Sequence, residues 1–108
     1  MQIESKENIM ADEVVSVAIL EALPGKEEEL LTVLREFYTM MHAKGYSSDS
    51  LHRDELRPER FLHLRRWKSA DLRTEAQIDP EVHRYWQQLP DLCTIATVYE
   101  SLETVFES

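Results

Sequence analysis

The chain has 108 residues, a length that fits a single domain. Its 12 Lys and Arg residues against 21 Asp and Glu residues give a net charge of −9, which disfavours nucleic acid as a partner because phosphates repel an acidic protein. The one cysteine, Cys93, excludes an internal disulfide, and no apolar run approaches the ~20 residues of a membrane-spanning helix.

The first 12 residues are polar and have no hydrophobic period. They predict a flexible leader at residues 1–12 in front of a single domain at residues 13–108. This segment also lacks the basic start and apolar stretch of a signal peptide, so we expect a cytoplasmic protein.

A strand and a helix are predicted in the first half of the domain. Residues 13–21 carry apolar side chains on both alternating faces, which indicates a central strand covered on both sides. For residues 25–44 we predict a helix, with Pro24 suited to its start and Gly45 to its end. Its apolar stripe, at helical spacing, consists of Leu30, Leu34, Phe37 and Met41.

The second half predicts a hairpin, a broken helix and a last strand. Strands at residues 46–54 and 60–68 flank a turn and form the hairpin. A second helix begins after Ser69, and Asp79-Pro80 is a combination of cap and first-turn residue that predicts a break in it. Residues 94–106 are expected to form a long final strand.

The hairpin also predicts its own register. If Asp54 lies opposite Arg60 at the end of the turn, a favourable cross-strand ion pair forms between Asp49 and Arg65. The same register places Leu51 opposite His63.

The order strand, helix, strand, strand, helix, strand predicts an α+β fold, the ferredoxin-like βαββαβ plait. It has a four-stranded antiparallel sheet with two helices on one face. The first strand is apolar on both faces, so the helices leave an apolar face of the sheet open. A second copy of the chain, packed sheet to sheet, is the simplest cover, and we therefore expect a homodimer.

Three stretches resemble the antibiotic-biosynthesis monooxygenase family: PGKEEELLTVLREF, GYSSDSLHRDELRPERFLHLRRWKS and IDPEVHRYW. The most specific piece is the HRD-x-x-x-P-x-R-F pattern at residues 52–61, and the resemblance covers residues 13–106. It implies ferredoxin-like subunits that pair into a dimeric α/β barrel. It also implies oxidation of electron-rich aromatics such as quinols and anthrones by O₂ without metal, flavin or haem, the substrate anion reducing O₂ directly.

The resemblance also indicates where the pocket lies. Family oxygenases line it with an Asn and a Trp four apart on the third strand, and His63 and Trp67 stand at those positions here. The sequence departs from the family in two further places: Arg65 stands where many members have a Glu, and Ala76 where many have a His.

Strand alternation places His63, Arg65 and Trp67 on one face of the third strand. We predict that His63 is the base that takes a substrate proton, that Trp67 stacks on the aromatic ring, and that Arg65 stabilises the oxyanion. The predicted substrate-binding residues around them are Asp49, Leu51, His83 and Trp86.

A structural interpretation of the same residues stays open. Trp67 could be a core residue, Arg65 could serve only to pair with Asp49, and His63 could be a half-buried strand residue. The alternative functions are then a dimeric small-molecule-binding or regulatory module without catalysis, and an isomerase acting on a small carbonyl compound.

No cofactor is predicted. The four histidines show no metal-binding spacing, and the two glycines cannot build a phosphate-binding loop, so we expect neither a metal nor a flavin or nucleotide.

Overall fold

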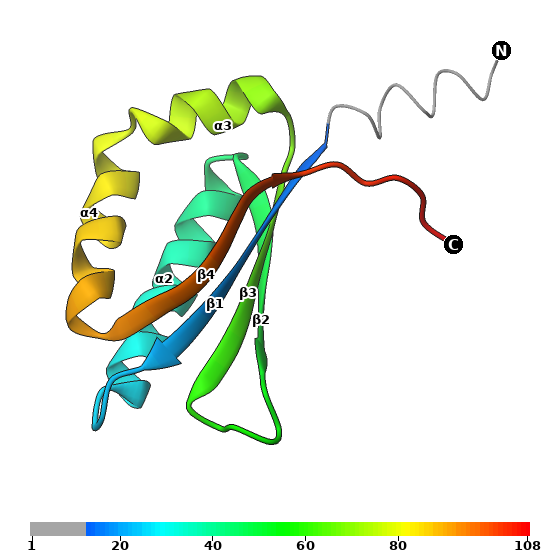
Figure 1. Ribbon diagram of the computed structural model, residues 1–108. Helices are drawn as coiled ribbons and strands as arrows, with labels where there is room; N and C mark the ends of the chain where they lie inside the picture. The colour runs from blue at the N-terminus through cyan, green and yellow to red at the C-terminus, as the bar shows by residue number, and fades with distance from the viewer. Residues whose placement is uncertain (1–12) are drawn as a thin grey trace, which may run out of the picture.

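Four antiparallel strands form one sheet in the order β2-β3-β1-β4, and the helices lie on one side of it (Figure 1). This computed structural model describes residues 13–108; the predicted leader at residues 1–12 lies outside them. The strands are β1 (Val14–Ala22), β2 (Ser47–Arg53), β3 (Arg60–Trp67) and β4 (Cys93–Leu102). The helices are α2 (Glu27–Ala43), α3 (Ala70–Gln77), α4 (Pro80–Gln88) and the short 3₁₀ helix η1 (Leu89–Asp91). The predicted ferredoxin-like topology, with β1 and β3 in the centre, is confirmed.

Helix α2 supplies the largest part of the core. Its apolar stripe faces the sheet, and its buried residues are Leu30, Val33, Leu34, Phe37 and Met41. They meet Leu20 of β1 and Phe61 and Trp67 of β3 in two neighbouring clusters. The predicted helical face is therefore the one that packs.

The start of α2 differs from the prediction. Pro24 and Gly25 lie in a turn in which the Lys26 N–H donates to the Leu23 carbonyl at 2.9 Å. The φ of Gly25 is 76°, and a turn of this kind favours Pro followed by Gly. Because this turn uses both residues, the helix begins at Glu27 rather than at residue 25.

The end of α2 agrees with the prediction. Gly45 has a φ of 78°, and its N–H donates to the His42 carbonyl at 3.0 Å. The Tyr46 N–H donates to the Met41 carbonyl at 3.0 Å. This pair of hydrogen bonds is the Schellman motif, which needs a left-handed residue where Gly45 stands.

The predicted break in the second helix is also confirmed. The Ser69 hydroxyl oxygen accepts the Leu72 N–H at 3.1 Å and caps α3. An Asp79 carboxylate oxygen accepts the Glu81 N–H at 2.9 Å and caps α4, which begins at Pro80. Two separate caps let α3 and α4 run in different directions, as Figure 1 shows.

The last strand is shorter than predicted, because β4 ends at Leu102 and not at residue 106. Its ladder with β1 ends where Leu102 lies opposite Val15, and β1 itself begins at Val14. Beyond this point the described chain offers residues 103–106 no strand to pair with.

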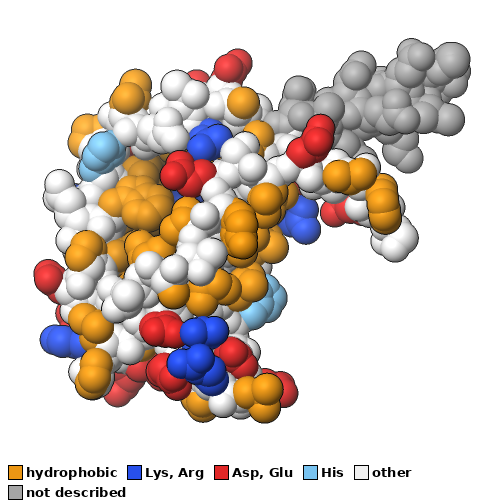
Figure 2. Space-filling view, in the orientation of Figure 1, with side chains coloured by type: hydrophobic (Ala, Val, Ile, Leu, Met, Phe, Trp, Pro, Cys, Tyr) orange, Lys and Arg blue, Asp and Glu red, His pale blue; other side chains and the backbone are white. Residues whose placement is uncertain are grey.

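The face of the sheet opposite the helices is apolar and open. Val17 and Ile19 of β1 lie opposite Leu64 and Leu62 of β3, and all four are only half-buried. On the neighbouring edge strand, Tyr99 is 55% exposed. Figure 2 shows hydrophobic side chains gathered along β4.

Candidate active site

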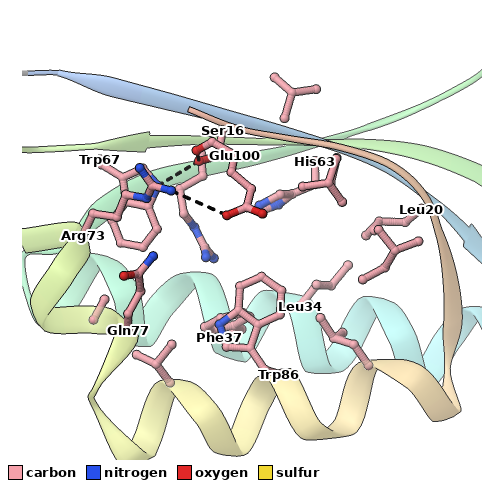
Figure 3. Close-up of a pocket in the computed structure, with 18 residues that line it drawn as sticks. Ser16, Leu20, Leu34, Phe37, His63, Trp67, Arg73, Gln77, Trp86 and Glu100 are labelled. Atoms are coloured by element: carbon pink, nitrogen blue, oxygen red, sulfur yellow. Dashed lines mark hydrogen bonds and ion pairs between the residues drawn. The ribbon is translucent and has the colours of Figure 1, made fainter. Parts of the chain in front are cut away.

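A cavity of about 360 Å³ lies between the sheet and the helices (Figure 3). Its sheet wall includes His63, Arg65 and Trp67, the three residues predicted to share one face of β3. Phe37 of α2 and Trp86 of α4 lie on the helix side. A mostly apolar pocket of this size with a few polar groups is typical of a small-molecule site.

Arg65 is held by a buried ion pair on the neighbouring strand. Its Nε donates to Asp49 Oδ1 at 2.8 Å and its Nη2 to Asp49 Oδ2 at 3.2 Å. The two side chains are only 2% and 0% exposed. The guanidinium carbon also lies 4.7 Å from the ring centre of Phe37 and 5.3 Å from that of Trp67. The ion pair uses the N–H of Nε and one N–H of Nη2, so Asp49 leaves the second N–H of Nη2 and both N–H groups of Nη1 free.

His63 is paired with a tyrosine from α2. The Tyr38 hydroxyl and His63 Nδ1 lie 2.5 Å apart, and His63 is 9% exposed. Burial, together with the positive charge of Arg65, lowers the pKa of His63 to about 3. Burial and the nearby Asp49 raise the pKa of Tyr38 above its ordinary range. Both partners are therefore neutral at pH 7, and Nε2 is the ring nitrogen of His63 that Tyr38 does not use.

Trp67 is fixed by two consecutive hydrogen bonds. Its indole N–H donates to the Ser16 hydroxyl oxygen at 3.0 Å, and the Ser16 hydroxyl donates to the Glu100 carbonyl at 2.6 Å. These bonds join β3, β1 and β4 at one end of the cavity (Figure 3). The indole ring is thereby positioned at the cavity wall by its polar edge.

Helix α3 brings two polar side chains to the same end of the cavity. Arg73 and Gln77 are four residues apart and therefore share a helix face, with the fully buried Ala76 between them. Arg73 Nη2 lies 3.7 Å from Glu100 Oε1, the ion pair drawn as a dashed line in Figure 3.

The predicted site residues fall into two groups. His63, Arg65, Trp67 and Trp86 line the cavity together. The other three lie outside its lining: Asp49 pairs with Arg65, Leu51 packs against the core, and His83 is exposed with its ring bonded to the Gln77 carbonyl. The roles predicted for all seven residues stay predictions.

The predicted site lacks five polar residues that line the cavity or contact its lining: Ser16, Tyr38, Arg73, Gln77 and Glu100. Tyr38 follows Leu34 by four residues, so a wider reading of the apolar face of α2 would have included it. The spacing of four residues places the α3 pair on one side of the predicted helix, but spacing alone does not show that this side faces the cavity.

Among residues 13–108, no group of three or more His, Cys, Asp or Glu side chains is arranged to hold a metal ion. Within the same described range, no helix has both the length and the apolar character needed to cross a membrane.

Comparison with known families gives one decisive match: the sequence model described as antibiotic biosynthesis monooxygenase matches residues 14–92. The chain belongs to this family. The match confirms the resemblance seen in the sequence, and it ends just before β4. No curated protein sequence matches the chain.

Solved structures of similar fold come from several bacteria. A variant of SnoaB, a cofactor-independent oxygenase from Streptomyces nogalater, is 20% identical with a TM-score of 0.75, over 90% of this chain and 100% of that one. PA3566 from Pseudomonas aeruginosa is 20% identical with a TM-score of 0.71, over 90% and 98%. Rv0793 from Mycobacterium tuberculosis is 19% identical with a TM-score of 0.69, over 87% and 99%. At these identities the likeness establishes the shared fold of this family member and not a shared substrate.

Proposed function

We propose that this family member is a cofactor-independent monooxygenase that oxidises an electron-rich aromatic small molecule, such as a quinol or an anthrone, with O₂. The observation that carries the proposal is the mostly apolar cavity in which His63, Arg65 and Trp67 meet. Family membership and the SnoaB-like fold support the same class of reaction.

The proposed reaction uses the substrate itself as the reductant. For an anthrone, loss of a C–H proton gives an enolate, which passes electrons to O₂. The CH₂ group becomes C=O, one oxygen atom stays in the product, and the other leaves as water.

In this proposal His63 takes the substrate proton through Nε2, which requires the tautomer with its proton on Nδ1; the Nδ1–H then donates to the Tyr38 hydroxyl oxygen. A pKa of about 3 makes the lone imidazole a weak base. The transfer, however, creates an anion next to the imidazolium, and the attraction between the two charges offsets the cost of burying either. Arg65 adds a fixed positive charge from the same wall.

Trp67 is proposed to position the ring. Its indole is anchored by Ser16, so one face can stay in place for an aromatic substrate to stack on. Trp86, 45% exposed, lies on the helix side of the same cavity. The same proposal includes the predicted site residues outside the cavity lining. Asp49 supports Arg65, and Leu51 and His83 contribute to substrate binding from positions near the site.

A homodimer is part of the same proposal. The open face of the sheet carries half-buried Val17, Ile19, Leu62 and Leu64, and Tyr99 lies beside them largely exposed. A second copy packed on this face would bury them. The cytoplasm stays a prediction from the sequence.

The test is O₂ uptake by purified protein with reduced naphthoquinols and anthrone as substrates. We expect uptake above the uncatalysed rate that falls at least about tenfold in His63→Gln and in Trp67→Leu, because each removes a proposed contact with the reacting molecule. His42→Gln is the matched control, since His42 is exposed in the last turn of α2 and does not line the cavity. Uptake that survives both cavity substitutions would place the reaction elsewhere.

One observation favours a second candidate, a small-molecule-binding module without catalysis. Ala76 lines the cavity where many family members have a histidine, and burial makes His63, with a pKa of about 3, a weak base. Binding of the same compounds without O₂ uptake would support this candidate.

A further inference from the structure

We infer that the substrate carries a carboxylate, and that Arg73 and Gln77 bind this group at the α3 end of the cavity. The inference deepens the proposed function and rests on it in taking the ligand to be a small aromatic molecule. It names a chemical class of substrate and two residues that determine specificity.

The first argument is the burial of Arg73. Its side chain is 22% exposed, and its acidic partner, Glu100, is 76% exposed and 3.7 Å away. A guanidinium has five N–H donors, and one contact of 3.7 Å with a solvent-exposed carboxylate leaves most of them free to donate to a ligand. A partly buried guanidinium at a cavity wall gains a strong, charge-assisted contact when an anion enters the cavity beside it.

The second argument is the arrangement around Arg73. Gln77 lies one turn along α3 on the same side, and its amide N–H₂ adds donors beside the guanidinium. Ala76 between them is small, so space is left in front of the two donors. Carboxylate oxygens accept well from such a pair of donors.

The third argument is the polarity of the whole cavity. Figure 3 shows Arg73 and Gln77 at one end and Leu20 and Leu34 at the other. The other cationic side chain in the lining, Arg65, already has a fully buried partner in Asp49. An aromatic molecule with one acidic end matches this distribution, with its ring between Trp67 and the helices.

Glu100 is the ion-pair partner of Arg73 in this structure, at the position that the inference assigns to the acid of the ligand. Its high exposure lets it move into solvent when a ligand carboxylate replaces it. The chain has a net charge of −9, so the preference for an anion comes from this local guanidinium and not from long-range attraction.

The test compares two probes that differ only in the acid: 1,4-dihydroxy-2-naphthoate and its methyl ester. Binding is measured by titration calorimetry without O₂, so that neither probe is consumed. We expect the wild type to bind the acid at least about tenfold more tightly than the ester, as a charge-assisted hydrogen-bonded contact would give.

Three variants locate the preference. Arg73→Gln should lose the advantage of the acid while its affinity for the ester stays within about twofold of the wild type. Arg35→Gln, the same substitution at an exposed position of α2, should keep the advantage. Glu100→Gln should tighten the binding of the acid and leave the ester unchanged, because it removes the competing carboxylate.

The inference fails if the wild type binds the ester as tightly as the acid, if neither probe binds, or if the preference survives in Arg73→Gln. These outcomes do not depend on turnover. A clear preference for the acid without O₂ uptake would support the carboxylate site and reject the oxygenase. O₂ uptake without a preference for the acid would support the oxygenase and reject the carboxylate site.

Discussion

Replacing Asp49 with Asn should destabilise the protein strongly, because it leaves the charge of Arg65 buried without a partner. The two side chains are 0% and 2% exposed and share two hydrogen bonds of 2.8 and 3.2 Å. Breaking one partner of such a buried pair costs about 3–5 kcal/mol. For a domain of this size, that corresponds to a fall in melting temperature of at least about 12 °C.

The assay is urea unfolding followed by tryptophan fluorescence, together with thermal melting. The double variant Asp49→Asn with Arg65→Met removes both charges and should recover at least about 2 kcal/mol of the loss, since no unpaired charge remains. Glu27→Gln is the matched control, because it breaks an exposed ion pair with Arg53 and should change stability little. If Asp49→Asn melts within a few degrees of the wild type, or the double variant is no more stable than the single one, the reasoning is wrong.

Three further predictions concern stability. The pKa of His63 is about 3 in the folded protein against an ordinary 6.5, so between these values the unfolded chain takes up a proton that the folded protein does not. The contribution of neutral His63 to the free energy of unfolding is therefore fully present above about pH 6.5 and is lost as the pH drops toward 3. Between pH 7 and pH 4.5 the free energy of unfolding measured in urea should fall by about 3 kcal/mol more in the wild type than in His63→Gln. An equal fall in both proteins would contradict the lowered pKa of His63. Gly45→Ala should lower the free energy of unfolding by about 1 kcal/mol because the φ of residue 45 is 78°, and Gly45→Asn should lower it less. Equal melting temperatures of the wild type and both variants would argue against a left-handed residue at this position. Ser69→Ala should cost about 1 kcal/mol by removing the cap of α3, whereas Ser69→Asp should retain most of it; a loss in both would point to something other than capping.

The hairpin shows what the sequence could predict. Asp49 and Arg65 are opposite charges at positions that only one register brings together, and the structure has that register. Because side chains alternate along a strand, His63, Arg65 and Trp67 share one face of β3 whatever the register. His63 and Trp67 could therefore be placed on one wall before the structure was known.

Other parts of the site depend on contacts between distant elements. Tyr38 reaches His63 from a helix 25 residues earlier, and no local pattern in either segment indicates this hydrogen bond. The lining side of α3 depends on how the helix packs against the sheet, so Arg73 could not be assigned to the cavity from spacing alone. His83 follows the lining residue Val82 by one position on α4 and therefore points away from the stripe.

The two strands β3 and β4, which both line the cavity, differ in how well they tolerate changes of sequence and length. His63, Arg65 and Trp67 stand on β3, which is paired on both sides, so altering its backbone would disturb two neighbours. Ile95, Val98 and Glu100 line the cavity from β4, an edge strand paired on one side only. Its ladder with β1 already contains two irregularities, near Ala96 and near Glu100, each of which accommodates an extra residue.

Insertions and substitutions in β4 thus cost less stability than the same changes in β3. The family match ends at residue 92 and therefore does not include this strand. Proteins of this fold can therefore keep the β3 wall of the cavity and vary its β4 edge.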